Sequence, residues 1–364
     1  MFFFSVPLLA QETRPWWYTL EQGKLFFRNG AYGNALVAFD DARRAREAQF
    51  SRMEQDMINL LSRPEVRRFG DSLERVEAYI SETKQSAAAL ALDELYHRLP
   101  KASLGGSANR VPEALDRLKA YPEAEYWLGE TYRVEGELAL ALRQYQIAYA
   151  RRDLLEIPSF EVEILYKIAD IHRLRTEYQD MEKTVLEILE GTGPDGAVRD
   201  SFWDQDQRRA AMTRMLENDG LSRFLTLYRY NNTSVERAHR LLGFFYFSSS
   251  RHLPAAEHLM FAFLIQNTVI IEEVIRGRFD FTFTTLGALM EEIRRNNRFE
   301  AFLEETEYFR TAYYLGSALF AAGKQKPARE LWDFLASAPE AGEWRVRSLS
   351  QLRSPYIEKA LEMP

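Results

Sequence analysis

The chain of 364 residues contains no cysteine. This absence excludes disulfide bonds, thiolate zinc sites, iron–sulfur clusters, a cysteine nucleophile and lipid attachment through cysteine. Glycine and proline are also scarce, with 18 and 13 residues, and the apolar fraction of 46% is too high for an intrinsically disordered chain. The fold therefore has to be held together by the packing of apolar side chains.

Positive charge is in deficit, with 47 Lys and Arg against 54 Asp and Glu and a net charge of −7. A surface that binds nucleic acid normally carries an excess of positive charge. Short basic clusters such as Arg43, Arg44 and Arg46 are diluted by nearby acids and are typical of a solvated helix face. We therefore expect no nucleic-acid partner.

Long apolar runs are also missing from the sequence. Residues 2–10 form a mostly apolar run, far shorter than the roughly 20 residues of a membrane-spanning helix, and residues 241–247 stop within two turns. The first run resembles the hydrophobic region of a secretory signal peptide with cleavage near Ala10, although no positive charge precedes it. We expect a signal-peptide remnant over 1–11 and a bacterial periplasmic or secreted location; the alternative is an apolar N-terminus that packs on the first helices of a cytoplasmic protein.

The pattern that dominates the chain is helical. Apolar residues recur at three- and four-residue spacing through 32–61 and 65–99, and Pro or Gly residues mark the ends of such segments. The one clear strand-like alternation, Phe279, Phe281 and Phe283, is too isolated to form a sheet. We predict an extended connector there that buries its Phe side chains, within an otherwise all-helical chain.

A repeated spacing of small and bulky residues runs through these helical segments. The pattern starts at a small residue, here called the anchor, and positions are counted from it. A bulky residue follows at plus three and a second small residue at plus seven. An Ala stands at plus twelve, a bulky residue at plus sixteen and an Ala at plus nineteen. The clearest copy consists of Gly129, Tyr132, Gly136, Ala141, Tyr145 and Ala148. The other copies are anchored on Gly23, Gly243, Gly316 and, more weakly, Ala169.

Each position of this pattern has a physical role. The first small residue lets two antiparallel helices approach closely, and the bulky residue one turn later fills the space beside that contact. The second small residue ends the first helix where a positive φ is needed. The last three positions lie on the inward face of the second helix.

The spacing resembles the tetratricopeptide repeat (TPR) family, whose unit is a helix–turn–helix of about 34 residues. Residues 119–152 look like a clear member and residues 16–45 are similarly close, whereas the copies around Ala169 and Gly243 depart at several positions. The resemblance implies an all-α fold, an α-solenoid of antiparallel helix pairs with degenerate repeats and helical insertions. The alternative is a set of chance matches among unrelated antiparallel helices.

The copies are not contiguous, so we predict insertions between them. The expected sections are 15–120, an N-terminal pair with a helical insertion; 121–190, the central repeats; 191–202, a linker; and 203–364, a degenerate TPR-like C-terminal section. The second helix is expected to run on past Ala42 toward Leu61, with two or three more helices over 64–120.

No catalytic constellation is visible. Gly191, Gly193 and Gly196 formally match a dinucleotide fingerprint, but a helical pattern precedes them and Pro194 interrupts them, which is typical of a linker. The five His show no pair at the spacing of a helical zinc site and are expected to be structural. We therefore expect no enzyme, no cofactor and no bound metal.

The family resemblance implies a concave groove that binds a peptide or a partner helix. It places Tyr126, Glu130 and Arg133 in that groove in one copy and Tyr166, Asp170 and Arg173 in the next. Exposed tyrosines and acids would suit a protein partner that carries Lys or Arg. The alternative is acid–Arg pairing within the chain, with no ligand.

The C-terminal copies place more apolar residues in the same groove: Arg240, Phe244, Phe247, Tyr313 and Phe320. These could hold a hydrophobic helix or a lipid-like ligand, or lie buried under another part of the chain such as residues 354–363. The main hypothesis is a non-enzymatic scaffold or docking factor of the bacterial cell envelope, for example in a motility or transport machine. The alternative is a component that binds a small hydrophobic ligand or lipid. The oligomeric state is not predicted.

Overall fold

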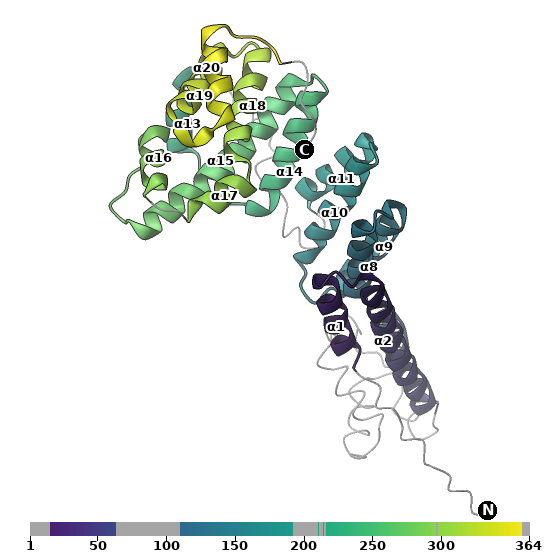
Figure 1. Cartoon of the computed structure of the whole chain (residues 1–364). Coiled ribbons are helices and arrows are strands. Elements are labelled where there is room, and N and C mark those ends of the chain that lie inside the picture. The colour runs from purple at the N-terminus through teal and green to yellow at the C-terminus, as the bar shows by residue number, and fades with distance from the viewer. Residues whose placement is uncertain are drawn as a thin grey trace, which may run out of the picture. The chain divides into compact units, whose positions relative to one another are not determined.

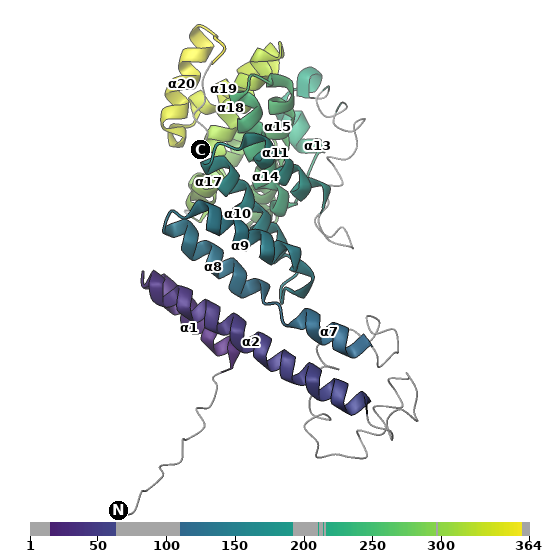
Figure 2. The same ribbon diagram turned by 90° about the vertical axis from the view of Figure 1, so that its right-hand side faces the viewer.

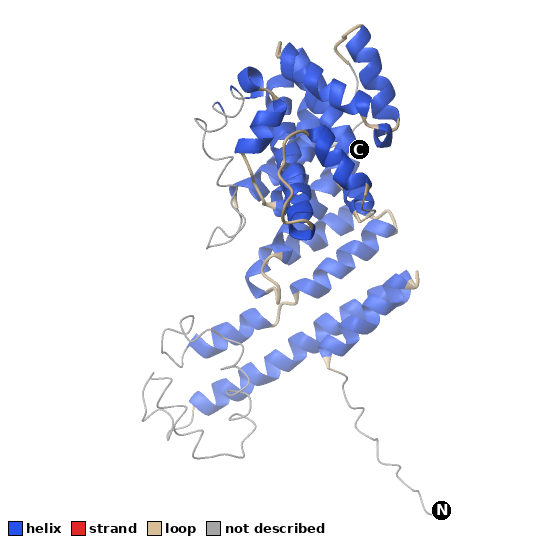
Figure 3. Ribbon diagram, turned by 90° about the vertical axis from the view of Figure 1, so that its left-hand side faces the viewer, coloured by secondary structure: helices blue, strands red, loops and turns tan. Residues whose placement is uncertain are grey.

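The computed structural model describes residues 15–62, 110–191, 210, 214, 216–295 and 298–358. Within these ranges every regular element is a helix and none is a strand (Figures 1 and 3). The predicted all-α class is therefore confirmed for the described residues. The expected signal-peptide remnant at 1–11, most of the linker at 191–202 and the expected helices between 64 and 109 lie outside them.

The chain divides into two compact units, residues 1–176 and 177–364, which are described separately. The first unit contains α1 (Trp16–Arg28), α2 (Tyr32–Leu61), α7 (Val111–Leu118), α8 (Pro122–Val134), α9 (Leu138–Ala150), the 3₁₀ turn η2 (Arg152–Leu154) and α10 (Phe160–Leu174). Helix α1 packs on α2, α8 packs on α9, and α2 also contacts α7 and α8 (Figure 2). The predicted extension of the second helix to Leu61 is confirmed.

The second unit contains α11 (Tyr178–Glu190), α13 (Leu221–Leu227), α14 (Thr233–Ser248), α15 (His252–Gly277), α16 (Leu286–Arg294), α17 (Phe299–Glu305), α18 (Tyr308–Ala321), α19 (Gln325–Ser337), η3 (Pro339–Ala341) and α20 (Glu343–Arg353). Helix α14 packs on both α11 and α15, and α15 also packs on α18. Helix α19 lies between α18 and α20.

Four repeat anchors are glycines at which two consecutive helices come into close contact. A β-carbon built on Gly23 would lie 2.4 Å from the Phe39 ring, and one built on Gly129 would lie 2.7 Å from the Tyr145 ring. The bulky partner in each case is the residue sixteen positions later. The four pairs are Gly23–Phe39, Gly129–Tyr145, Gly243–Leu259 and Gly316–Trp332. The close approach that the sequence predicts at these positions is confirmed.

The turn after the first helix of each copy is also recurrent. The residue at plus seven has a positive φ in all five copies, including the two non-glycine residues Thr176 and Ser250, both at 59°. In the four copies anchored on glycine, the backbone N–H of the residue at plus eight donates a hydrogen bond to the backbone carbonyl of the residue at plus three. In the first copy this bond runs from Ala31 to Phe26, at 2.9 Å. Thr176 and Ser250 adopt a conformation that costs a non-glycine residue about 1–2 kcal/mol, so the geometry of the turn is kept where its glycine is lost.

The second helix of each copy turns the predicted face inward. Every residue at plus twelve, plus sixteen and plus nineteen from its anchor is at most 1% exposed. These residues are Ala35, Phe39 and Ala42; Ala141, Tyr145 and Ala148; Met181, Val185 and Ile188; Ala255, Leu259 and Ala262; and Ala328, Trp332 and Leu335. The repeat pattern therefore marks the core of both units.

A buried arginine holds four helices of the first unit together. The Arg46 guanidinium of α2 lies 4.7 Å from the ring centroids of both Trp16 and Tyr121, and its Nε donates to the Leu118 carbonyl at 2.9 Å. Guanidinium groups are favourable over aromatic faces, and more so where water is excluded. Arg46, one of the basic residues expected on a solvated face, is therefore a core residue.

Among the described residues, helix α15 is long and apolar enough to cross a membrane by length and composition alone, which the short apolar runs of the sequence did not indicate. Its most apolar window has a mean hydropathy of 1.4, but 78% of that window is buried inside the protein. Its polar side chains are paired there, since Tyr308 donates to Asn267 at 3.0 Å and Thr268 accepts from the Tyr230 N–H at 3.0 Å. This packing is that of a core helix.

The close glycine contacts make a direct prediction about stability. Gly23→Ala should destabilise the protein by about 2 kcal/mol because its β-carbon collides with the Phe39 ring. Gly33→Ala, in the partner helix, should be neutral or stabilising by up to about 0.5 kcal/mol, since open space surrounds Gly33 and Ala favours a helix. Urea unfolding of the two variants measures the contrast, and equal stabilities would contradict the role of Gly23.

Candidate functional site

The groove residues expected around Gly129 are mostly buried in the first unit. Tyr126 of α8 is 6% exposed, and its ring packs against Phe160 at 4.7 Å and Tyr145 at 5.7 Å. Glu130 is also 6% exposed, while Arg133 is half-buried. The expectation that Tyr126 and Glu130 are exposed to a ligand is wrong, because neighbouring helices of the chain cover both side chains.

Glu130 lies at the centre of a polar network within the first unit. It accepts hydrogen bonds from Tyr145 and from Arg133 at 3.1 Å, and Lys167 of α10 lies 3.1 Å away. Burial favours the neutral acid, but the hydrogen bonds from Arg133 and Tyr145 and the charge of Lys167 outweigh it and lower the pKa of Glu130. The carboxylate therefore stabilises the contact between α8, α9 and α10.

The second expected set, on α10, follows the same pattern. Tyr166 is 5% exposed, which corrects its expected exposure. Asp170 and Arg173 are half-buried and form an ion pair at 2.7 Å. Both acid–Arg pairs are thus made within the chain, which is the alternative that the sequence left open.

The aromatic groove expected in the second unit is filled by the chain itself. Phe244, Phe247 and Tyr313 are at most 3% exposed. Trp344 of α20 packs on Tyr313 at 5.4 Å, and Tyr313 donates to Glu358 at 2.6 Å. Helix α20 and the segment after it therefore cover Tyr313, while Phe244 and Phe247 pack against Tyr314 of α18, so these positions do not form an open apolar groove.

The two remaining predicted residues also contact the chain. Arg240 pairs with Glu236 of its own helix at 3.1 Å and with Glu307. Phe320 is half-buried with its ring 5.6 Å from Trp332. Neither side chain projects alone into solvent.

An open cleft of about 880 Å³ lies beside this covered cluster, within the second unit. It is formed by α17, the start of α18, η3 and the start of α20. Phe309 and Trp344 are half-buried and supply aromatic surface, while Tyr314, whose ring lies 5.7 Å from that of Trp344, is only 3% exposed. This cleft is the candidate site, and we call it the α18–α20 cleft.

Charged residues line the α18–α20 cleft with an excess of acids: Glu304, Glu307, Glu340 and Glu343, against Arg310 and Arg347. Each arginine already has contacts within the protein. Arg310 pairs with Glu307 at 2.5 Å and lies over the Phe244 ring at 4.7 Å, while Arg347 lies over the Trp344 ring at 5.0 Å.

The lining acids differ in how firmly they are held. Glu340 is paired with Arg294, and Glu307 is paired with both Arg240 and Arg310. Glu304 is exposed, and the Glu343 side chain is 65% exposed with only a 3.6 Å contact to Arg347. Glu304 and Glu343 are therefore the acids best placed to meet a cationic group that enters the cleft.

Two histidines form a buried pair in the core of the second unit. The Nδ1 atoms of His239 and His258 lie 2.9 Å apart, and both side chains are at most 1% exposed. One Nδ1 must carry the proton and the other must accept it. This hydrogen bond fits the expectation of structural histidines.

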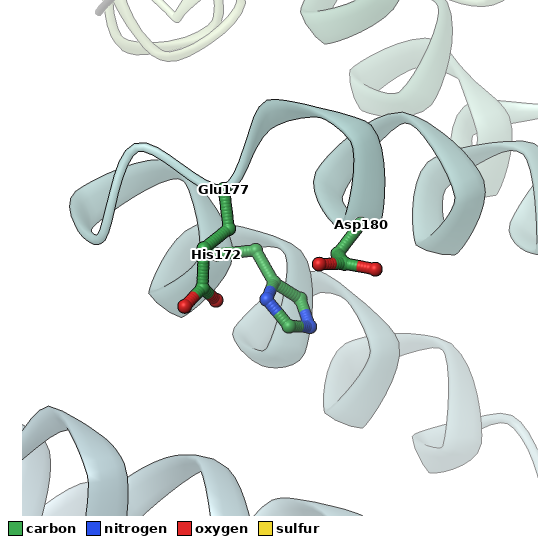
Figure 4. A group of neighbouring side chains, drawn as sticks. All are labelled: His172, Glu177 and Asp180. Carbon is green, nitrogen blue, oxygen red and sulfur yellow. The ribbon is translucent and has the colours of Figure 1, made fainter.

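His172 lies in the last turn of α10, Glu177 is the residue before α11, and Asp180 lies in the first turn of α11 (Figure 4). Imidazole and carboxylate groups are common metal ligands. The boundary between the two units falls between Thr176 and Glu177, so these three side chains do not form a site within either unit. The absence of a bound metal stays a prediction from the sequence.

No family model matches this chain. An uncharacterized protein of Treponema pallidum (strain Nichols) is 23% identical over 337 residues, which cover 92% of this chain and 89% of that protein. An uncharacterized protein of Borreliella burgdorferi is 25% identical over 279 residues, which cover 71% of this chain and 86% of that protein. The first similarity runs through both units.

The network around Glu130 generates a prediction about stability and pH. Glu130→Gln should cost about 1–3 kcal/mol near neutral pH, because the charge that Arg133 and Lys167 face is lost. Since the folded pKa of Glu130 is lowered, its contribution is present above about pH 4.5 and is lost as the pH falls through the folded pKa. Urea unfolding of both proteins across this range measures the difference.

Glu163→Gln is the matched control, because Glu163 faces the same lysine at 3.6 Å from a more exposed position. Its effect should stay below about 0.5 kcal/mol. A Glu130→Gln variant as stable as the wild type near neutral pH would contradict the assigned role.

Proposed function

We propose that this protein is a non-enzymatic, TPR-like α-solenoid of antiparallel helix pairs that docks protein partners. Two features support the solenoid. The glycine contact to the residue sixteen positions later occurs in four copies, and the positive φ at plus seven occurs in all five. Stacked pairs of this kind bury their apolar faces against their neighbours and leave one face of the array open.

The α18–α20 cleft is the observation that carries the docking function. In the repeat pattern α18 and α19 are the two helices of the copy anchored on Gly316, so α20 follows as the first helix of the next pair. Helices α18 and α20 are then successive first helices, which line the groove in the family that the sequence resembles. The cleft lies at this position and has space for a peptide segment.

The lining of the cleft favours a partner segment that carries Lys or Arg next to an apolar residue. The lining holds four carboxylates and two arginines, of which Glu304 and Glu343 are the exposed acids, and the half-buried rings of Phe309 and Trp344 can pack on either an alkyl chain or a cation. A segment rich in Asp or Glu would meet the excess of acids and be disfavoured.

We further propose export to a bacterial periplasm, where the protein would act in an envelope assembly such as a motility or transport machine. The apolar run at 2–10 and the small residue Ala10 support this location. N-terminal sequencing of the native protein should find a mature end near residue 11. A native protein that retains Met1 in the cytosol would contradict export.

Charge reversal in the cleft tests the docking function. A Glu304→Lys, Glu343→Lys double variant should reduce by about tenfold the recovery of a protein captured from native cells by the tagged wild type. Both side chains are exposed, so the fold should be unaffected. Quantitative mass spectrometry of the captured proteins, followed by titration of the purified partner, measures the loss.

The matched control is a Glu300→Lys, Glu305→Lys variant. These two acids are exposed on α17, outside the cleft lining, and their reversal changes the net charge by the same amount. An equal loss of partner recovery in both variants would indicate a general charge effect and would contradict partner binding at the α18–α20 cleft. Failure of the wild type to enrich any protein over the tag alone would contradict the docking function itself.

A further inference from the structure

The connector between α15 and α16 presents an aromatic side chain to solvent. Phe283 is 6% exposed and lies under the Arg229 guanidinium at 5.4 Å, and Phe281 is half-buried. Phe279, however, is 95% exposed, so its predicted burial is wrong. It is the most exposed large apolar side chain among the described residues, and burial of a Phe normally provides a large favourable free energy.

The backbone of the turn that carries Phe279 is fixed by hydrogen bonds. The Phe281 N–H donates to the Arg278 carbonyl at 3.0 Å, which closes a β-turn with Phe279 and Asp280 at its centre. Arg278 fixes this turn, because its guanidinium donates to Asp280 at 3.2 Å and to Glu292 of α16 at 2.6 Å. A turn fixed at its base presents Phe279 with less conformational entropy to lose on binding.

Four arginines lie near the base of this turn, and they are more exposed than the two glutamates that pair with them, Glu273 and Glu292; Asp280, which also pairs with Arg278, is 62% exposed. Glu292 is 14% exposed and contacts Arg278 and Arg295, which are 46% and 65% exposed. Glu273 is 29% exposed and contacts Arg276 and Arg298, which are 72% and 43% exposed. Around Phe279 the exposed charge is therefore four guanidinium groups and the Asp280 carboxylate, with the Glu273 and Glu292 carboxylates more deeply buried.

We propose that Phe279, with Arg276, Arg278, Arg295 and Arg298, forms a contact surface for a protein partner, here called the Phe279 tip. The partner would offer an apolar pocket to the Phe279 ring and carboxylates to the surrounding arginines. Aromatic and arginine side chains dominate the energetics of protein interfaces, and a rim of complementary charge favours one register of docking.

The charges favour a protein over a lipid surface as the partner. Attraction to an anionic bilayer acts over a Debye length and depends on net positive charge. Each arginine of the tip is paired with a nearby acid, which weakens that field, whereas a docked protein can contact the exposed guanidinium edges directly. The tip shares no lining residue with the α18–α20 cleft, so this proposal does not rest on the docking function of the cleft.

Site-specific crosslinking in native cells tests the Phe279 tip. Position 279 is replaced by the photoreactive residue p-benzoylphenylalanine, and Leu253, which is 50% exposed near the opposite end of α15, is replaced in the control. We expect a crosslink to one other protein from position 279 and none to that protein from position 253.

The crosslinked protein is then purified and titrated against the wild type. Phe279→Ala and an Arg276→Glu, Arg295→Glu variant should each weaken binding by about tenfold or more, and added salt should weaken wild-type binding. The thermal stability of Phe279→Ala should equal that of the wild type, because the removed ring is exposed. Phe283→Ala, which removes a buried ring of the same loop, should lower it.

Three results would overturn the proposal. These are no crosslink specific to position 279, a crosslink only to a second copy of this chain, and unchanged partner affinity in Phe279→Ala. A further measurement tests binding to vesicles of phosphatidylcholine with phosphatidylglycerol. Binding of the wild type but not of Phe279→Ala to them would assign the tip to a membrane surface instead.

Discussion

The contact between a glycine backbone and a bulky side chain sixteen residues later sets the spacing of the helices in both units. At Gly23, Gly129, Gly243 and Gly316 a β-carbon would lie within 3 Å of the opposing side chain, so no larger residue fits without a shift. This contact fixes how closely two consecutive helices approach. The turn with positive φ then fixes where the first helix ends, and the inward face of the second helix follows from its periodicity.

These features were predictable from the sequence because every partner lies within about one helix–turn–helix of its anchor. The outward surface was not predictable in the same way. Tyr126 is packed against Phe160, and Tyr313 against Trp344 and Glu358, which lie after the copies that contain the two tyrosines and occupy no position of their repeat patterns. The cleft was missed for the same reason, although the aromatic residues before Gly316 and around Trp344 are a visible signal. The predicted burial of Phe279 was wrong for another reason. The alternation of Phe279, Phe281 and Phe283 indicates the direction in which their side chains point, and it does not show whether other residues cover them.

The acids of the chain fall into two groups that a sequence pattern does not separate. Glu130 occupies a groove position of the repeat, yet Tyr145, Arg133 and Lys167 supply enough donors to keep it ionised while buried. Such a carboxylate is committed to the fold, because a partner would have to break several buried contacts to reach it. Glu304 and Glu343 are exposed beside aromatic surface, and Glu343 has only a 3.6 Å contact with Arg347, so a partner could reach them without breaking buried contacts. Exposure and existing partners, more than residue type, therefore decide which acids can recognise another molecule.

The second unit carries two candidate surfaces of opposite character. The α18–α20 cleft is concave, aromatic and lined by an excess of acids, whereas the Phe279 tip is a convex turn surrounded by exposed guanidinium groups. Under the two proposals, a basic segment that suits the cleft would be disfavoured beside the exposed arginines of the tip, which would limit competition between the two partners. The separate surfaces would then let one chain hold two different partners at the same time. That property suits a scaffold, and it depends on local charge arrangements that the net charge of the chain does not reveal.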